Sequence, residues 1–374
     1  MFIILSLFII CALFVYGIET TQNESQKRYL IWVCLGFMTI VSGTRLCGGL
    51  DFPTYEDHYQ QLATFPDVLN PVNVNQNYEI GYTYIASFFK TVGISFYGFC
   101  LIHAAFFFFC LWKGLSRYTN HFGIVILVFL YKLFFYNTMI SMRQSITIAL
   151  FFVLLPLIEN KKFLRYYICV FFVSKIHNGS FLLYALYPLI YITLDKGRIR
   201  WLNLIFIPTI AIGMAGIDVM GPIGLFLQDN AANEAIGSKA SKYFENENMS
   251  PIGIFHTLEY FLVMFLFYKN IHHFDLKDSK THLVVWMFLC LLPLFTLLRG
   301  SEILTREKDY FVIFYAVIIG MLIDRIPQKK SLLYIGITLL CAFGYYRYVI
   351  SFDGGHFLTY TSWMFDHHYS FFSN

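Results

Sequence analysis

Apolar segments that approach the length of a membrane span recur along the whole chain, and no other feature constrains the fold as strongly. A spanning helix needs roughly 20 predominantly apolar residues, with about 17–25 as the usual range. Residues 79–92 are a candidate for a short or re-entrant helix. About twelve longer segments, separated by charged breaks, lie near residues 2–17, 29–46, 95–113, 121–136, 143–158, 163–176, 179–194, 202–218, 253–270, 282–299, 308–325 and 331–348.

Composition supports the same fold class. Of the 374 residues, 57% are hydrophobic and 13% are charged, whereas a soluble globular protein has about 25% charged residues. We therefore expect an all-α polytopic membrane protein, with residues 1–374 forming one membrane domain. The shorter segments must tilt or lie inside the helix bundle. The net charge is +4, and the basic residues form no continuous stripe. This argues against a nucleic-acid partner.

The distribution of basic residues predicts the orientation in the membrane. Lys and Arg accumulate in cytoplasmic loops. Six short alternate loops hold 16 of the 27 basic residues, whereas 16 of the 23 acidic residues fall on the other side. Both termini should therefore lie outside, together with the loops 46–94 and 219–252 and the tail 349–374. Because polar residues of several chemical types gather in these outer parts, we expect an outward-facing site formed by loops and short helices.

Arg143 is the most unusual residue of the apolar segments. It lies in "NTMISMRQSITIAL", residues 137–150, with Gln144 beside it. A charged residue within a membrane is costly and is normally kept where it pairs or faces a wet cavity. An anion bound there would accept hydrogen bonds from the guanidinium and from the free backbone N–H groups at the start of the helix. The alternatives are that Arg143 snorkels to the interface or pairs with a carboxylate of the bundle.

His177 lies in the predicted outer turn "KIHNGS", between two short apolar segments. Histidine is the natural proton acceptor near neutral pH. His177 is therefore a candidate general base, and the alternative is a structural histidine held by hydrogen bonds.

The segment "LRGSEILTREKDY", residues 298–310, concentrates charge near an outer helix end. Glu302 and Arg306 are four residues apart and can pair on one helical face. Arg299 and Arg306 are candidates to join Arg143 in a clamp for a polyvalent anion. A solvated helix entrance is the simpler explanation for the remaining charged residues, Glu307, Lys308 and Asp309.

Carboxylates alternate with tyrosines in the outer loop 46–94. Acids bind sugar hydroxyls and aromatic rings stack on the apolar faces of sugars, so this composition suits a carbohydrate. An aromatic belt at headgroup depth is the alternative for the tyrosines. A metal site is a weaker possibility for Asp51, Glu56, Asp57 and His58. The residues concerned are Asp51, Tyr55, Glu56, Asp57, His58, Tyr59, Tyr78, Glu79, Tyr82 and Tyr84.

Several nucleotide and hydrolase motifs are absent from the sequence. It contains no P-loop, GxGxxG, HExxH or GxSxG motif. ATP-driven transport, dinucleotide chemistry, zinc proteolysis and serine hydrolysis therefore lack their usual signals. We expect no cofactor and no metal.

A set of short motifs resembles the EpsG-like family of membrane proteins, which includes Wzy-type O-antigen and exopolysaccharide polymerases. The order is "DFPTY", "YEIGY", "SMRQSITIAL", a basic inner loop, "KIHNGS" and "EILTR" followed by "YF". The resemblance covers roughly residues 45–315, and the MRQS run and the turn histidine are its most specific parts.

The resemblance implies a polymerase of the bacterial inner membrane with its active site facing the periplasm. It would transfer the growing glycan from undecaprenyl pyrophosphate to a sugar hydroxyl of the next lipid-linked repeat unit. Besides that substrate and membrane lipid, a chain-length regulator in the membrane is a candidate partner. The positions that match recurring polar residues of the family are Asp51, Tyr55, Glu79, Arg143, His177, Arg306 and Tyr310.

In that mechanism the arginines would stabilise the leaving pyrophosphate, since the guanidinium fork suits phosphate oxygens. His177, or else Glu79 or Asp51, would accept the proton of the hydroxyl. The expected catalytic residues are Arg143, His177, Arg306 and Glu79. The expected substrate-binding residues are Asp51, Tyr55, Tyr78, Gln144, Arg299, Glu302 and Tyr310.

Two rival classes stay open at this point. A lipid-linked oligosaccharide flippase or other transporter should carry polar residues along the middle of several helices and have two related halves. Here the polar residues concentrate at outer ends and in outer loops, which favours an enzyme. Among enzymes, an O-antigen ligase or a surface-sugar acyltransferase would use a similar outward site.

Overall fold

The computed structural model describes residues 2–46, 49, 51–73, 78–217, 219, 222, 254–298, 304–325, 330–351 and 359–372. These residues form helices and no strand, which confirms the all-α prediction. The chain divides into two compact units. The first combines Met1–Tyr184 with Ile326–Asn374, and the second is Ala185–Arg325.

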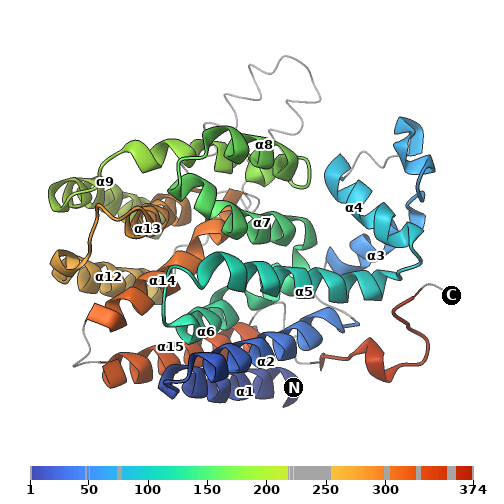
Figure 1. The fold of residues 1–374 in the computed structure, drawn as a ribbon, viewed down its shortest axis with the longest axis horizontal. Helices are drawn as coiled ribbons and strands as arrows, with labels where there is room; N and C mark the ends of the chain where they lie inside the picture. Colours follow the sequence, from blue (N-terminus) through green and yellow to red (C-terminus); the bar gives the residue numbers. More distant parts are fainter. Residues whose placement is uncertain are drawn as a thin grey trace. The chain divides into compact units, whose positions relative to one another are not determined.

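The first unit is a helix bundle with two short helices at one end. Its α-helices are α1 (Phe2–Thr20), α2 (Glu24–Gly43), α3 (Asp51–Gln61), α4 (Ile80–Thr91), α5 (Phe96–Leu115), α6 (Phe122–Lys132), α7 (Met142–Glu159), α8 (Phe163–Ser174) and α15 (Lys330–Ser351). Within it, α2 packs against α1 and α5, α7 packs against α5 and α8, and α6 packs against α1 and α15 (Figure 1). A single π-helical turn (Tyr136–Ile140) precedes α7.

The second unit is organised around one central helix. Its α-helices are α9 (Lys196–Met214), α12 (Ile254–Lys269), α13 (Ser279–Leu297) and α14 (Asp309–Arg325). Helix α13 packs against α9 and α14, and α12 packs against α14. The side chain of Asp278 accepts the N–H of Thr281 at 3.0 Å and so caps the start of α13. A hydrogen bond of 2.7 Å from Thr296 to Thr209 joins α13 to α9.

Five of the described helices are long and apolar enough to cross a membrane, namely α1, α5, α7, α13 and α15. Helices α6 and α8 are apolar but shorter. The structure therefore agrees with a polytopic membrane protein. The total of about twelve spans stays a prediction. Every expected segment except 179–194 coincides with an α-helix, and residues 79–92 contain α4.

Residues 179–194 differ from the expected apolar α-helix. They form parts of two 3₁₀-helices, η4 (Asn178–Ala185) and η5 (Tyr187–Tyr191). Two tyrosine hydroxyls from α8 donate to backbone carbonyls of η4, Tyr166 to Leu183 at 2.6 Å and Tyr167 to Tyr184 at 3.2 Å. In an α-helix these carbonyls would accept backbone N–H groups of the same helix, but here they accept hydroxyl groups of α8. Pro188 also has no N–H that could donate to an α-helical hydrogen bond.

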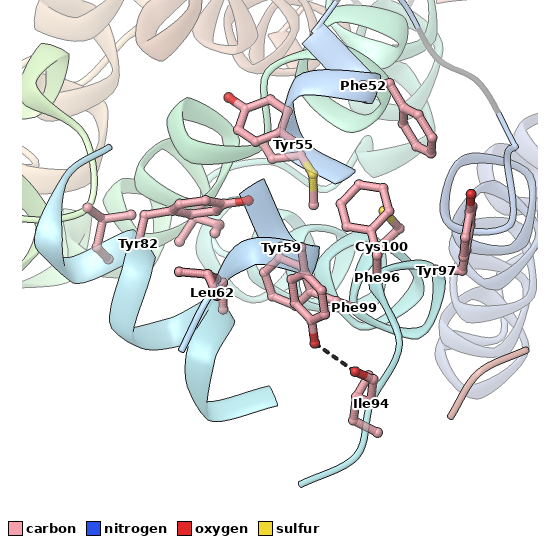
Figure 2. Packing of buried hydrophobic residues seen from close by; sticks show 14 of the residues in the cluster. Phe52, Tyr55, Tyr59, Leu62, Tyr82, Ile94, Phe96, Tyr97, Phe99 and Cys100 are labelled. Atoms are coloured by element: carbon pink, nitrogen blue, oxygen red, sulfur yellow. Dashed lines mark hydrogen bonds between the residues drawn. The ribbon is translucent and has the colours of Figure 1, made fainter. Parts of the chain in front are cut away.

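An aromatic core holds α3 and α4 against the start of α5 (Figure 2). The Tyr59 ring stacks on Phe99 with centroids 5.5 Å apart, and its hydroxyl donates to the carbonyl of Ile94 at 2.8 Å. Each such aromatic pair adds about 0.5–1.5 kcal/mol beyond the burial of apolar area. The core therefore makes α3 and α4, which lie in the loop predicted to be outside, packed parts of the first unit. Its largest members include Phe52, Tyr55, Tyr59, Tyr82, Phe96, Tyr97, Phe99 and Trp363.

The C-terminal segment 359–372 forms hydrogen bonds with residues on both sides of this core. The Trp363 indole donates to the carbonyl of Gly43, at the end of α2 and before α3. The backbone N–H of Ser95, at the start of α5, donates to the carbonyl of Phe371 at 2.9 Å. Because both flanks of the α3–α4 region are held, this short segment helps to fix the position of α3.

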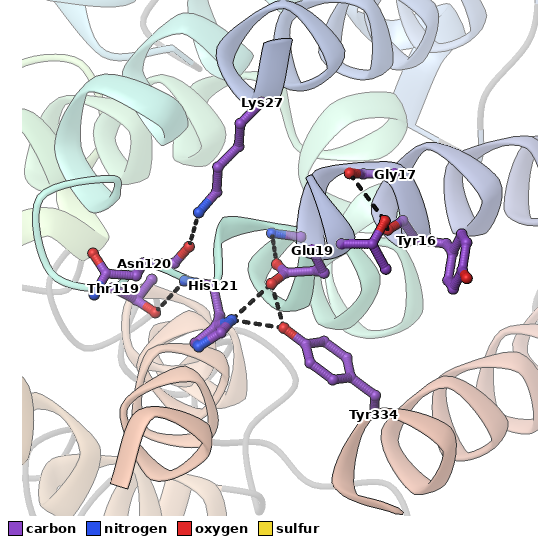
Figure 3. Close-up of polar contacts among 10 residues, drawn as sticks. Tyr16, Gly17, Glu19, Lys27, Thr119, Asn120, His121 and Tyr334 are labelled. Atoms are coloured by element: carbon purple, nitrogen blue, oxygen red, sulfur yellow. Dashed lines mark hydrogen bonds and ion pairs between the residues drawn. The ribbon is translucent and has the colours of Figure 1, made fainter. Parts of the chain in front are cut away.

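A buried polar cluster joins other elements of the first unit (Figure 3). His121 Nδ1 lies 2.7 Å from a carboxylate oxygen of Glu19, at the end of α1. The Tyr334 hydroxyl, in the first turn of α15, donates to the same carboxylate. The N–H of Gly123 donates to its other oxygen at 2.8 Å. The cluster therefore ties α1, the start of α6 and α15 together.

Candidate active site

Arg143 lies in the first turn of α7 and contacts residues from two other parts of the first unit, helix α3 and the residues that lead into α4. Its Nη1 donates to the Glu79 carboxylate at 2.5 Å, and its Nε donates to the Tyr55 hydroxyl at 3.3 Å. The guanidinium carbon also lies 4.8 Å from the centre of the Tyr78 ring. Arg143 thus pairs with a carboxylate, one of the alternatives considered from the sequence. Its side chain nevertheless stays 26% exposed.

Glu79 connects the arginine to the turn that contains His177. One of its oxygens binds Arg143, and the other accepts the N–H of Asn178 at 3.1 Å and lies 3.4 Å from His177 Nδ1. Partial burial raises the pKa of this carboxyl, but His177, the positive charge of Arg143 and the N–H of Asn178 outweigh burial and lower the pKa to about 2. Glu79 is therefore ionised at neutral pH and a weak base.

A close backbone contact sets the position of Glu79. The residue precedes α4, and the N–H of Gly81 in the first turn of that helix donates to the carbonyl of Lys175 at 2.8 Å. A Cβ at Gly81 would lie only 2.7 Å from that oxygen. Only glycine allows the start of α4 to approach the turn after α8 so closely, which explains why "YEIGY" and "KIHNGS" form one site.

Aromatic side chains surround the arginine on the side of α3 and α4. Tyr55 and Tyr78 lie with ring centroids 5.9 Å apart, and the Tyr78 hydroxyl donates to the carbonyl of Thr54 at 3.2 Å. The His58 ring stacks on Tyr78 at 3.8 Å, with an interplanar angle of 18°. Because α3 presents residues 54, 55 and 58 on one face, it forms a wall of the site.

The sequence-predicted residues divide into three groups. The first unit brings together Arg143, Glu79, His177, Tyr55 and Tyr78. Burial is the largest cause that raises the pKa of Tyr55 and Tyr78, the charge of Arg143 lowers it, and nearby Asp51 makes a smaller contribution that raises it. Gln144 is buried beside this group, where its amide oxygen accepts a hydrogen bond from Ser141. Arg306 and Tyr310 belong to the second unit, while Arg299 and Glu302 lie outside the described residues.

The prediction that residues 307–309 form a solvated start of a helix is wrong. Glu307 is 7% exposed and Asp309 is 5% exposed, and Lys308 Nζ lies 3.5 Å from the Asp309 carboxylate. Burial, followed by the charge of Asp309, raises the pKa of Glu307 to about 8. Alternating charges in a sequence do not show how far a helix end is covered by its neighbours, so exposure could not be predicted from them.

The arrangement can support acid–base and anion-binding chemistry together. The Glu79 carboxylate lies 3.4 Å from His177 Nδ1, which makes no hydrogen bond to a described residue. A hydrogen bond formed there would orient the imidazole and leave Nε2 to accept a proton, as in other carboxylate–histidine pairs. Arg143 Nη2 makes no hydrogen bond with any described residue, so it can donate to an anion. Arg143 lies beside Tyr55 and Tyr78, whose hydroxyls and ring faces suit a sugar.

A model of the EpsG family matches residues 28–362, nearly the whole chain. The chain belongs to the EpsG family. This is a family of Wzy-like polymerases, so the EpsG match and the apolar helices indicate a membrane-embedded protein of the polysaccharide-polymerase type. No curated protein and no solved structure matches the chain.

Two contributors to the site of this EpsG protein were not predicted from its sequence. His58 was considered only as part of a weak metal site, and the backbone N–H of Asn178 had no assigned role. The spacing of Tyr55 and His58, three residues apart, was the available signal for His58, because it places both on one helical face. The N–H of Asn178 had no signal, since every non-proline residue carries one.

Proposed function

We propose that this EpsG protein polymerises lipid-linked oligosaccharide repeat units at the periplasmic face of the bacterial inner membrane. The bond between the growing glycan and undecaprenyl pyrophosphate breaks, and the pyrophosphate leaves with the electron pair. A new glycosidic bond forms to a hydroxyl of the next repeat unit, and the hydroxyl proton passes to the protein. The observation that carries the proposal is the simultaneous contact of Glu79 with Arg143 and His177.

Arg143 would bind and stabilise the pyrophosphate. Its Nη1 is held by Glu79, and Nη2 remains available to a phosphate oxygen. A guanidinium held in one orientation suits phosphate oxygens better than a flexible ammonium does. A preorganised donor of this kind is worth about 3–4 kcal/mol in the transition state. Because the arginine supplies positive charge at the leaving group, the proposal requires no metal.

His177 would accept the hydroxyl proton at Nε2. Its Nδ1 faces the Glu79 carboxylate, which stays ionised and therefore favours the imidazolium that forms. Before proton transfer, the charges of Arg143 and Glu79 cancel. After transfer, the site gains one positive charge as the pyrophosphate gains negative charge. Proton uptake and departure of the leaving group therefore support each other.

The tyrosines and Asp51 would bind the sugars next to the reacting atoms. Tyr55 and Tyr78 offer hydroxyls and ring faces beside Arg143, and Asp51 lies at the start of the same helix, α3. The roles predicted for Arg306 and Tyr310 stay predictions, because the proposal rests on residues of the first unit.

Purified protein mixed with undecaprenyl-pyrophosphate-linked repeat units tests the proposal. The wild type should produce a ladder of products on a gel, and His177→Gln should lower turnover by about 10²–10⁴-fold while the lipid-linked donor still binds. His368→Gln is the matched control, because this exposed histidine contacts only Asp366 among the described residues. A His177→Gln protein with wild-type turnover would exclude His177 as the base.

The gene deletion separates polymerisation from the rival activities. Loss of a polymerase should leave surface polysaccharide with a single repeat unit, whereas loss of a ligase or flippase should leave no capped product. The second pattern would contradict the proposal.

A further inference from the structure

His58 occupies an unusual position for a histidine. It lies in the last turn of α3 and is 4% exposed. Its ring is nearly parallel to Tyr78, with centroids 3.8 Å apart, and to Tyr82, with centroids 6.1 Å apart. His58 therefore packs as an aromatic side chain, between α3 and the residues at the start of α4.

The imidazole nitrogens of His58 are not used for hydrogen bonding within the described residues. Its Nε2 is fully buried and has no hydrogen-bond partner. Burial first, and the charge of Arg143 second, lower the pKa of His58 to about 4. The ring is therefore neutral at physiological pH and contributes its flat surface.

The Tyr78 ring contacts Arg143 as well as His58. The guanidinium carbon lies 4.8 Å from the centre of the Tyr78 ring. Besides its ring contacts, Tyr78 makes one hydrogen bond within the described residues, from its hydroxyl to the carbonyl of Thr54. Among the described residues, the stack on His58 at 3.8 Å is the closest ring contact of Tyr78, since Tyr55 and Tyr82 both lie 5.9 Å away. His58 therefore supports the Tyr78 ring most directly, and that ring supports the guanidinium.

We propose that His58 is a positioning residue for Arg143. Its neutral ring holds Tyr78 in place, and Tyr78 holds the guanidinium so that Nη2 points away from the Glu79 contact and toward the substrate. A positive charge at His58 would place a second cation on the same tyrosine and repel Arg143. The inference rests on the proposed function for its catalytic consequence, but the arrangement itself can be tested without activity.

Three substitutions of His58 separate packing, charge and hydrogen bonding. His58→Phe keeps the stack, His58→Ala removes it, and His58→Arg keeps a planar group but adds a permanent charge. We expect His58→Phe to retain kcat near that of the wild type. His58→Ala and His58→Arg should lose about tenfold or more in kcat, because small displacements of a catalytic group cost up to about 10²-fold. The KM for the acceptor unit should change little.

Tyr59→Phe is the matched control on the same helix. It removes the hydrogen bond to Ile94 but keeps the stack on Phe99. This variant should lower the unfolding temperature and leave kcat unchanged, which separates general destabilisation from loss of positioning.

Labelling of Arg143 with phenylglyoxal gives a readout that does not depend on polymerisation. Peptide mass spectrometry should show faster modification in His58→Ala than in the wild type, and no change in His58→Phe. If the wild type forms no ladder but this labelling pattern holds, the proposed function fails and the positioning role stands.

Two results would overturn the inference while the wild type polymerises normally. If His58→Phe is as inactive as His58→Ala, a nitrogen of the imidazole acts on the substrate directly. If His58→Ala or His58→Arg has wild-type kcat and unchanged labelling of Arg143, the stack positions nothing.

Discussion

Replacing Glu79 by Gln tests the central contact of the site most directly. The substitution keeps the size of the side chain and removes its charge. The carboxylate accepts hydrogen bonds from Arg143 and Asn178 and lies 3.4 Å from His177. A Gln oxygen can keep one of these hydrogen bonds, but a neutral amide cannot favour a protonated His177.

The cost in stability follows from the pKa of Glu79. A pKa lowered from 4.5 to about 2 corresponds to about 3 kcal/mol, since a tenfold change in an acid constant is worth about 1.4 kcal/mol. The folded state has the lower pKa, so this stability is fully present above the unfolded value and is lost as the pH falls toward 2. We expect Glu79→Gln to lose up to about 3 kcal/mol at pH 7 and less in acid.

The cost in turnover should exceed the cost in folding. Because a neutral amide cannot favour a protonated His177, turnover should fall by about 10²–10⁴-fold, the range for loss of general base catalysis. The assays are thermal unfolding in detergent and ladder formation by protein that remains folded. Glu56→Gln is the matched control, because that carboxylate accepts a hydrogen bond from Tyr97 at 2.7 Å and is not among the described hydrogen-bond or ion-pair partners of Arg143. A Glu79→Gln protein with wild-type turnover would refute the assigned role of the carboxylate.

Three further experiments test other parts of the reasoning. Arg143→Lys should lose most activity at normal abundance, because an ammonium cannot reproduce the planar fork; wild-type turnover would reduce the role of Arg143 to its charge. Gly81→Ala should lower turnover and the unfolding temperature, because its Cβ would lie 2.7 Å from the carbonyl of Lys175; an unchanged enzyme would show that α4 can shift freely. Cysteines placed at Gly197 and Ala240 in a cysteine-free protein should react oppositely with an impermeant reagent, and labelling of Gly197 in intact cells would invert the predicted topology.

Matched controls exist for the first two of these substitutions. Arg198→Lys changes an exposed arginine that donates to Thr193 in the second unit, and should leave turnover unchanged. Gly36→Ala adds a methyl group that would meet no atom within 4 Å apart from its chain neighbours and the backbone of its own helix, and should be tolerated in α2.

The sequence determined the class of the protein and the identity of much of the site. Apolar composition and charged breaks predicted an all-helical membrane protein, because a bilayer accepts only segments that satisfy their own backbone hydrogen bonds. The cost of burying a charge singled out Arg143, and the ability of histidine to accept a proton near neutral pH singled out His177. The prediction failed at residues 179–194, where hydrogen bonds from two tyrosines of α8 accompany 3₁₀-helices.

Only the tertiary structure decided which of these residues meet. Glu79 is 64 residues from Arg143 and 99 residues from Asn178 in the chain, yet it bonds both. Sequence spacing predicts contacts within a helix, where geometry repeats every 3.6 residues, but it carries no distance between separate elements. The close approach of Gly81 to Lys175 and the stack of His58 on Tyr78 depend on how α4, α8 and α3 pack. In the proposed mechanism, this packing allows Glu79 to orient His177, and His177 acts as the base.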